Sequence, residues 1–245
     1  MSKPSIIPLL PSIPLSPLPD YPAKEMASGS RSCNGWFALG NGGPGFNVGL
    51  WEADANESVW IDYPFHDFML VLEGELGIET EQGRVMAREG EALFVPRGLH
   101  CRYLQPRYVK KIVAAFDNPA EPMVRRSSGL IKIDPKVAVA PSTPPAASML
   151  FSPVPIQNNH DYYSDSTGQL NIGVWDTTGY TRKLIDFPRH ELMHLIEGSV
   201  TFEDDQGAKQ SFKAGDTFFV PMGTPNSWMS EGYLRKIFVT FQPKP

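Results

Sequence analysis

The stretch Asn47-Val48-Gly49-Leu50-Trp51-Glu52 returns as Asn171-Ile172-Gly173-Val174-Trp175-Asp176, a spacing of 124 residues. Fifteen residues after each tryptophan stands a histidine followed by an acid, first His66-Asp67 and then His190-Glu191. After one inserted residue, Phe94-Val95-Pro96-Arg97-Gly98 matches Phe219-Val220-Pro221-Met222-Gly223 at a spacing of 125. A repeat of this length is a duplicated domain, since solenoid units span only about 20–50 residues.

Composition narrows the class of protein. The chain has 245 residues and a net charge of −5, which fits two domains of about 100 residues. No basic run exceeds a pair of residues, so we expect no nucleic-acid partner. No apolar run approaches the roughly 20 residues that cross a bilayer, and prolines interrupt the first 22 residues. We therefore expect a cytoplasmic protein with no membrane partner, in which Cys33 and Cys101 are free thiols.

The hydrophobic pattern predicts an all-β fold. Short runs rich in Val, Ile, Phe and Trp alternate with Gly, Pro and Asp turns, as in antiparallel strands. We divide the chain into a Pro-rich arm with a Gly-rich stretch (1–44), a first domain (45–116), a Pro-rich linker (117–158) and a second domain (159–245). The linker holds one possible strand at 130–133. The arm is either a disordered tail or docks on its own chain or on a neighbouring subunit.

The spacing of acid, glycine and proline residues carries a family resemblance. Both repeats have an acid, a glycine seven residues on, a hairpin tip, and then Gly-(five residues)-Pro-x-Gly. The positions are Asp67, Gly74, Gly83, Gly90, Pro96 and Gly98, and then Glu191, Gly198, Gly207, Gly215, Pro221 and Gly223. This resembles the two motifs of the RmlC-like cupin superfamily, whose domains are jelly-roll (double-stranded β-helix) barrels. The resemblance implies two tandem cupin barrels, a bicupin.

The second repeat resembles most the DUF861-like subfamily, which includes ethanolamine-utilisation cupins and parts of ureidoglycine aminohydrolase. In that subfamily Pro-x-Gly is followed by a tryptophan, matched here by Pro221, Gly223 and Trp228. The metal set of the aminohydrolase would fall on Ile185, Phe187 and Glu191, and two of these three residues cannot bind a metal. That activity is therefore not carried over to this chain.

The resemblance also implies a metal site that this sequence has largely lost. Metal-binding cupins have His-x-His before the Glu and a third His after Pro-x-Gly; here 185–189 contain no histidine, and Asn226 stands at the third position. We predict no metal cofactor. The alternative is a divalent metal such as Zn, Mn, Fe or Ni on a rebuilt site, drawn from His66, Asp67, His100 and Cys101 or from His190, Glu191 and His194. Strand alternation places His190 and His194 opposite Glu191, which argues against the second set.

Glu191 is the candidate general acid/base, because an acid inside a barrel needs a partner and has a perturbed pKa. Arg182, Lys183 and Arg189 are its candidate partners. Further candidate ligand-binding residues are Trp175, Met193, Asn226 and Trp228 in the second barrel and Trp51, Asp67, Cys101 and Tyr103 in the first. The alternative for the aromatic residues is that they fill the barrel cores. We favour the second barrel as the active one, because it keeps the Glu.

These observations predict a bicupin that binds a small molecule, either as a metal-independent enzyme or as a sensor, for a small nitrogenous or carboxylate metabolite. One alternative is a metal-dependent hydrolase or lyase with a rebuilt site. The other is a structural bicupin whose barrels are filled by side chains. We also expect a homodimer, since cupin sheets bury apolar faces against partners.

Overall fold

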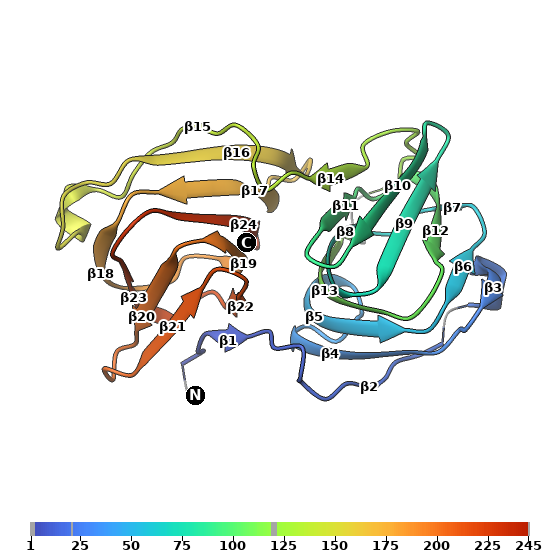
Figure 1. Cartoon of the computed structure of the whole chain (residues 1–245), viewed down its shortest axis with the longest axis horizontal. Coiled ribbons are helices and arrows are strands. Elements are labelled where there is room, and N and C mark those ends of the chain that lie inside the picture. Colours follow the sequence, from blue (N-terminus) through green and yellow to red (C-terminus); the bar gives the residue numbers. More distant parts are fainter. Residues whose placement is uncertain (1–2, 21, 119–121, 245) are drawn as a thin grey trace. The chain divides into compact units, whose positions relative to one another are not determined.

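The computed structural model describes residues 3–20, 22–118 and 122–244. The chain forms two compact units, Leu10–Ile133 and Met1–Leu9 together with Asp134–Pro245 (Figure 1). Each unit is built from two antiparallel β-sheets. In the described residues the helical segments are single 3-10 turns, η1 (Ala23–Glu25) and η2 (Ala147–Met149), and no helix is long and apolar enough to span a membrane. The predicted all-β fold of two jelly-roll barrels is confirmed.

The first unit contains the first repeat. Its larger sheet has the order β14 (Ile131–Ile133), β11 (Ala92–Val95), β8 (His66–Glu73), β13 (Val109–Asp117), β5 (Gly45–Ala53), β4 (Cys33–Leu39) and β2 (Ser16–Pro17). Its smaller sheet has the order β10 (Gly83–Arg88), β9 (Glu75–Thr80), β12 (His100–Gln105), β6 (Asn56–Ser58) and β3 (Met26–Gly29), and β7 (Ile61–Asp62) also pairs with β12. Apolar side chains from both sheets form one buried cluster between them.

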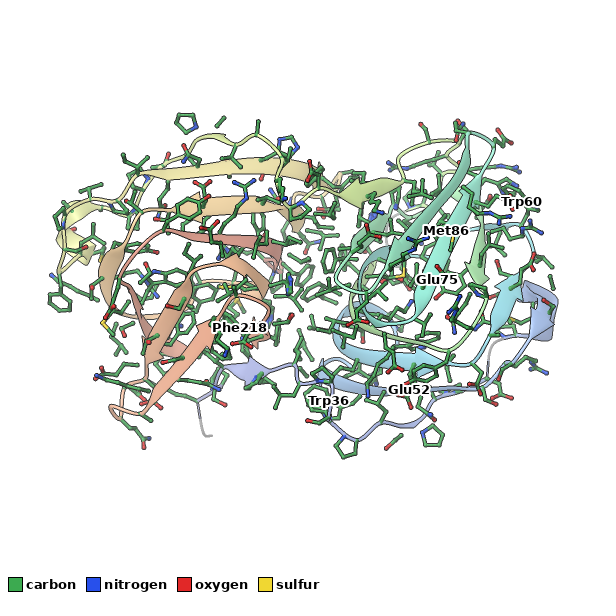
Figure 2. The ribbon with its side chains drawn as sticks, in the orientation of Figure 1. Trp36, Glu52, Trp60, Glu75, Met86 and Phe218 are labelled. Carbon is green, nitrogen blue, oxygen red and sulfur yellow. The ribbon has the colours of Figure 1, made fainter. Side chains whose placement is uncertain are left out.

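The second unit repeats this plan. Its larger sheet has the order β1 (Ile7–Pro8), β22 (Thr217–Val220), β19 (His190–Glu197), β24 (Leu234–Phe241), β17 (Leu170–Thr177), β16 (Gln157–Ser164) and β15 (Ala140–Pro141). The smaller sheet has the order β18 (Tyr180–Asp186), β23 (Pro225–Ser230), β20 (Ser199–Glu203) and β21 (Lys209–Lys213). One end of its core is aromatic: Phe218, drawn inside this unit in Figure 2, stacks on Phe212 at 3.9 Å between ring centroids.

The repeated glycine of the opening stretch has a packing reason. A Cβ atom at Gly49 would lie 2.0 Å from the carbonyl oxygen of Trp36, and one at Gly173 would lie 2.4 Å from that of His160. Trp36 and His160 stand on the neighbouring strands β4 and β16. Only glycine allows these strands to approach so closely, which explains why the residue recurs in both repeats.

Two of the predicted segments contain more structure than we expected. The stretch 1–44 was predicted to precede the first domain, yet β3 and β4 belong to the sheets of the first unit, and β4 pairs along most of β5. The segment 117–158 was predicted to be a linker, yet it includes β14, β15 and the first residues of β16. Prolines and glycines mark the ends of these strands. Because such residues are also typical of loops between domains, we had placed the domain boundaries there.

The N-terminal arm docks on its own chain. Strand β1 pairs with β22 in the second repeat, as Figure 1 shows, and the backbone of Leu9 continues the ladder by donating to the Thr217 carbonyl. The possible strand at 130–133 is β14, and it pairs with β11 in the first repeat in the equivalent way. The larger sheet of each unit thus ends in a short edge strand, β1 or β14, from a segment outside the repeats. Pro8 is tolerated because β1 is an edge strand.

We predict that Leu9→Ala lowers the free energy of unfolding of the second unit by about 2–5 kcal/mol, because this side chain is only 2% exposed. The matched control is Leu10→Ala, whose side chain is 52% exposed and should cost less than about 0.5 kcal/mol. Chemical denaturation of the two variants measures the difference. Equal denaturation midpoints for both variants would contradict the docked arm.

Candidate functional site

A pocket of about 440 Å³ opens in the second barrel. It lies between the two sheets of that barrel, because its walls come from strands β16, β17, β18, β19, β23 and β24. The residues that carry its chemistry are Trp175, Arg182, Arg189, Glu191, Met193, Trp228 and Lys236. Asn226 is not part of this lining but accepts a hydrogen bond from Arg182. We call this space the second-barrel pocket. It gathers three of the predicted ligand-binding residues of this repeat, Trp175, Met193 and Trp228, around the predicted acid.

Strand alternation brings Glu191 into the pocket. On β19, Glu191 and Met193 point inward and are 2% and 1% exposed, whereas His190 and His194 lie on the opposite face. Both carboxylate oxygens of Glu191 are engaged. Lys236 Nζ donates to Oε1 at 2.6 Å, and Arg189 Nε and Nη2 donate to Oε2 at 3.2 and 3.1 Å. The predicted partner Arg189 is therefore present, and Lys236 is a partner that the sequence analysis missed.

Lys236 sits in an aromatic cage. Its Nζ lies 4.8 Å from the ring centroid of Trp175 and 5.5 Å from that of Trp228, distances at which an ammonium is attracted to the ring faces. It also donates to the sulfur of Met193 at 3.3 Å. The side chain is 6% exposed, so the ammonium is held by these groups and by Glu191 rather than by bulk water.

Arg182 engages the position where the cupin motif has its third histidine. Its Nη2 donates to Asn226 Oδ1 at 2.7 Å, and Asn226 is 1% exposed. The other terminal nitrogen, Nη1, is buried and has no hydrogen-bond partner among the described residues. A buried guanidinium nitrogen with an unused hydrogen is ready to bind an acceptor that enters the pocket.

The electrostatics of the pocket favour negative ligands. Burial alone would raise the pKa of Glu191, but Lys236 and then Arg189 outweigh it and hold this pKa below its ordinary value. Burial lowers the pKa of Lys236, an effect that Glu191 partly offsets. Burial also lowers the pKa of Arg182, although a guanidinium stays charged at neutral pH. Three cationic side chains and two carboxylates, Glu191 and Asp161, thus line the pocket, which leaves a surplus of one positive charge.

The first barrel also contains a buried lysine and a buried acid, Lys111 and Asp67. Lys111 occupies the position equivalent to Lys236, with Nζ 3.0 Å from the sulfur of Met69 and 4.5 Å from the ring centroid of Trp51. Asp67 replaces Glu191: its Oδ2 accepts from the Tyr63 hydroxyl at 2.8 Å, and its Oδ1 has no hydrogen-bond partner among the described residues. Burial raises the pKa of Asp67 and outweighs Lys111 and Tyr63.

The remaining candidates of the first barrel are part of its packed core. Trp51, Cys101 and Tyr103 belong to one buried cluster together with Tyr63 and Met69. Burial raises the pKa of the Cys101 thiol to about 12, so the thiolate that a nucleophile or a metal ligand requires is disfavoured.

Three substitutions distinguish the barrels at equivalent positions. Where the second repeat has Arg182 and Arg189, the first has Ser58 and Phe65, which carry no charge. Where the first repeat has Tyr63, which donates to Asp67, the second has Phe187, which cannot donate a hydrogen bond. Glu191 is therefore bound by Lys236 and Arg189 instead. The two repeats therefore share the lysine and the acid, but the surplus of positive charge belongs to the second barrel.

The histidines do not form the alternative metal sites. His66 and His190 are equivalent residues that stack on phenylalanine rings, and their Nδ1 atoms accept the backbone N–H of Arg97 and Met222. This role needs a neutral ring, in keeping with the burial that lowers the pKa of His190. His194 Nδ1 pairs with Thr217 Oγ1 at 2.8 Å, on the face opposite Glu191.

His100 is likewise occupied, because its Nδ1 lies 2.7 Å from Asp62 Oδ1 and its ring stacks on Trp60. The sets His66, Asp67, His100, Cys101 and His190, Glu191, His194 are therefore not brought together. In the part of the chain that the structure describes, no group of three or more His, Cys, Asp or Glu side chains is placed to hold a metal ion.

The sequence contained a signal for the missed lysines. Tyr108-Val109-Lys110-Lys111-Ile112 and Tyr233-Leu234-Arg235-Lys236-Ile237 repeat at a spacing of 125 residues, and in both the second cation falls on the inward face of an apolar strand. A lysine that recurs at an inward position in both repeats indicates a buried partner acid. Lys183, another predicted partner of Glu191, instead donates to the Ser148 carbonyl.

Comparisons with known proteins find a match to a cupin domain in the second repeat. Residues 165–238 match the family described as the EutQ-like cupin domain. No curated protein matches the chain. A solved structure of a DUF861-family protein of unknown function from Pseudomonas syringae pv. tomato str. DC3000 is similar over 97% of this chain and 100% of its own, with a TM-score of 0.79 and 25% identity.

Two more distant structures share the fold. The Cupin 2 conserved barrel domain protein from Leptotrichia buccalis is similar over 94% of this chain and 99% of its own, with a TM-score of 0.57 and 13% identity. A salicylate 1,2-dioxygenase from Pseudaminobacter salicylatoxidans is similar over 84% of this chain and 76% of its own, with a TM-score of 0.50 and 15% identity. At these identities the likeness concerns the fold alone.

We predict that Lys236→Met lowers the free energy of unfolding by about 3–5 kcal/mol, because it leaves the buried Glu191 with Arg189 as its sole cationic partner. The double variant Lys236→Met/Glu191→Gln should lose clearly less than the sum of the two single variants. Lys183→Met, a lysine of the same barrel that does not contact Glu191, is the control and should cost about 1 kcal/mol or less. Additive losses in urea denaturation would show that the two side chains do not interact.

We also predict that the stability difference between the wild type and Glu191→Gln shrinks in acid. The pKa of Glu191 is lowered in the folded state, so the ionised carboxylate stabilises the fold fully above its ordinary pKa of 4.5. This contribution is lost as the pH falls through the lowered folded pKa. Denaturation of both proteins between about pH 7 and pH 3 measures the difference.

The variant Asp67→Asn should show a change of stability with pH in the opposite direction. Because the pKa of Asp67 is raised in the folded state, the wild type should gain stability relative to this variant as the carboxyl takes up its proton. A difference between the wild type and Glu191→Gln that stays constant over the whole range would contradict the lowered pKa of Glu191.

Proposed function

We propose that the second barrel of this RmlC-like bicupin, whose second repeat matches the EutQ-like cupin domain, binds a small organic carboxylate. One observation carries the proposal: Lys236, Arg182 and Arg189 line a pocket of about 440 Å³, in which Lys236 and Arg189 pair with Glu191 while Arg182 pairs with the amide of Asn226. A pocket with surplus cations inside a desolvated barrel attracts anions of matching size.

The free donors of the pocket support this ligand class. Glu191 has both oxygens engaged by Lys236 and Arg189, so it offers little further capacity as an acceptor. Arg182 keeps an unused Nη1 hydrogen, and Arg189 is 44% exposed at its side chain, so both can bind a ligand carboxylate from the pocket. Trp175 and Trp228 supply apolar surface for the rest of a small ligand. A nitrogenous metabolite that carries a positive charge would be repelled by these side chains.

The metal that the cupin fold implies does not fit this donor set. The positions of the motif histidines carry Ile185 and Phe187, which have no ligand atoms, and they line the pocket. The two polar positions that remain are occupied by cations, Glu191 by Lys236 and Asn226 by Arg182. A divalent ion would have to displace an ammonium and approach two guanidinium groups. We therefore propose a metal-independent site, and the hydrolase that depends on a rebuilt metal site has no support.

Glu191 and Lys236 form the proton-transfer pair of this site. Their atoms are 2.6 Å apart, within the distance at which a proton passes directly between heteroatoms. A bound carboxylate whose reactive carbon lies next to them would meet a base and an acid together. Glu191 and Lys236 can therefore act as base and acid toward a bound ligand. A protein that only senses the ligand would need Arg182 and Arg189 but not this pair.

The first barrel supports a structural role. Its acid and lysine are buried in a core closed by Trp51, Tyr63 and Tyr103, and it lacks both arginines. The alternative of a filled structural barrel, raised from the sequence for the whole protein, is thus favoured for this repeat alone.

We predict that propionate binds to the protein and that propylammonium, which matches it in size but not in charge, does not. Arg182→Gln should weaken propionate binding about 10-fold or more, since a hydrogen bond to a charged group contributes about 1.5–3 kcal/mol. Isothermal titration calorimetry at low salt measures both, and added salt should weaken binding.

Lys183→Gln is the matched control, because this lysine of the same strand β18 donates to Ser148 and not to Arg182 or Glu191. Its affinity for propionate should equal that of the wild type. Binding of propylammonium in preference to propionate, or an unchanged affinity in Arg182→Gln, would overturn the proposed ligand class.

A further inference from the structure

Among the described residues, Lys236 is the one primary amine that lines the second-barrel pocket. Its Nζ lies 2.6 Å from Glu191 Oε1, and the residue is 6% exposed at the wall of the pocket. An amine with an adjacent carboxylate, in a pocket that Arg182 and Arg189 also line, has the groups needed to attack a carbonyl carbon.

We propose that Lys236 forms an imine with the carbonyl group of a small oxo acid, such as a 2-oxo acid or an aldehyde acid, and that Glu191 carries the protons. This inference rests on the proposed function, because the carboxylate of the oxo acid is held by Arg182 and Arg189. These guanidinium groups bind carboxylate oxygens in fixed geometry, which orients the neighbouring carbonyl toward the amine.

The chemistry balances without an oxidant or a further reactant. Glu191 takes one proton from the Lys236 ammonium, and the freed lone pair of Nζ bonds to the carbonyl carbon while the carbonyl π electrons move to oxygen. Glu191 returns the proton to that oxygen, which gives a carbinolamine. A second proton passes from Nζ through Glu191 to the hydroxyl group, the C–O bond breaks, and the nitrogen lone pair forms C=N. One ammonium and one carbonyl compound thus give one iminium and one water.

The surroundings of Lys236 determine how readily it becomes neutral. Burial lowers its pKa, and the nearby Arg189 and Arg182 act in the same direction, whereas Glu191 favours the ammonium and so do the faces of Trp175 and Trp228. Protonation of Glu191 by the ammonium leaves two neutral groups, a state that a desolvated pair tolerates better than an exposed pair.

The first barrel offers an internal contrast. Lys111 occupies the equivalent position, but Asp67 is bound by Tyr63 rather than by an arginine, and Ser58 and Phe65 stand where the second repeat has its carboxylate-binding residues. The first barrel therefore has an amine without the side chains that would bring an oxo acid to it. The proposal is accordingly confined to Lys236.

The experiment treats the whole protein with pyruvate or glyoxylate in the presence of sodium borohydride, which reduces an imine to a stable secondary amine. We expect intact-mass spectrometry to show one carboxyalkyl group added per chain, and peptide mapping to place it on Lys236. Propionate, which has a carboxylate and no carbonyl, should compete with the labelling and should leave no adduct.

Lys236→Arg keeps the positive charge and removes the primary amine, and Lys183→Gln is the control within the same barrel. We expect Lys236→Arg to lose the adduct and Lys183→Gln to be labelled like the wild type. If pyruvate and propionate bind to the wild type but borohydride leaves Lys236 unmodified, the imine is refuted and the carboxylate site stands. Labelling of Lys236 no faster than of surface lysines would also refute it. If neither acid binds, the proposed function itself fails.

Discussion

The second barrel depends on one buried ion pair, in which Lys236 Nζ and Glu191 Oε1 are 2.6 Å apart. Neither charge is stable in a barrel core alone, because transfer from water costs several kcal/mol per ion. Each is therefore retained through the other, and Trp175, Trp228 and Met193 pack around the ammonium. The pair keeps polar chemistry inside an otherwise apolar β-sandwich.

The duplication shows how little is needed to turn one scaffold into two environments. Both barrels keep a lysine on the equivalent strand, a methionine beside it and an aromatic cage. In the first barrel, the hydroxyl group of Tyr63 donates a hydrogen bond to Asp67. In the second barrel, Phe187 at the equivalent position has no hydroxyl group, and Arg189 donates to Glu191 instead. The arginine approaches from a half-exposed position, so the acid is satisfied while the pocket stays accessible.

The fold and most of the pocket could be predicted from the sequence because repeat spacing and strand alternation are regular. They place Glu191, Met193, Asn226 and Trp228 inward and His190 outward, as the structure has them. Lys236 was missed because a lysine on an apolar strand is normally solvated, and only its recurrence as Lys111 indicates otherwise. The strands β1 and β2 were missed because two-residue strands carry no periodic pattern.

The loss of the motif histidines and the gain of the lysine have one electrostatic explanation. A cupin that exchanges its imidazole ligands for Ile185 and Phe187 leaves a buried glutamate without a counter-charge. The ammonium group of Lys236 supplies the counter-charge to Glu191. It carries one positive charge, where a divalent metal ion carries two, and it has hydrogens that can be transferred. Arg182 on Asn226 neutralises no carboxylate, so its charge exceeds what the fold requires. A buried charge without a structural counterpart is costly, and binding of an anion would compensate it.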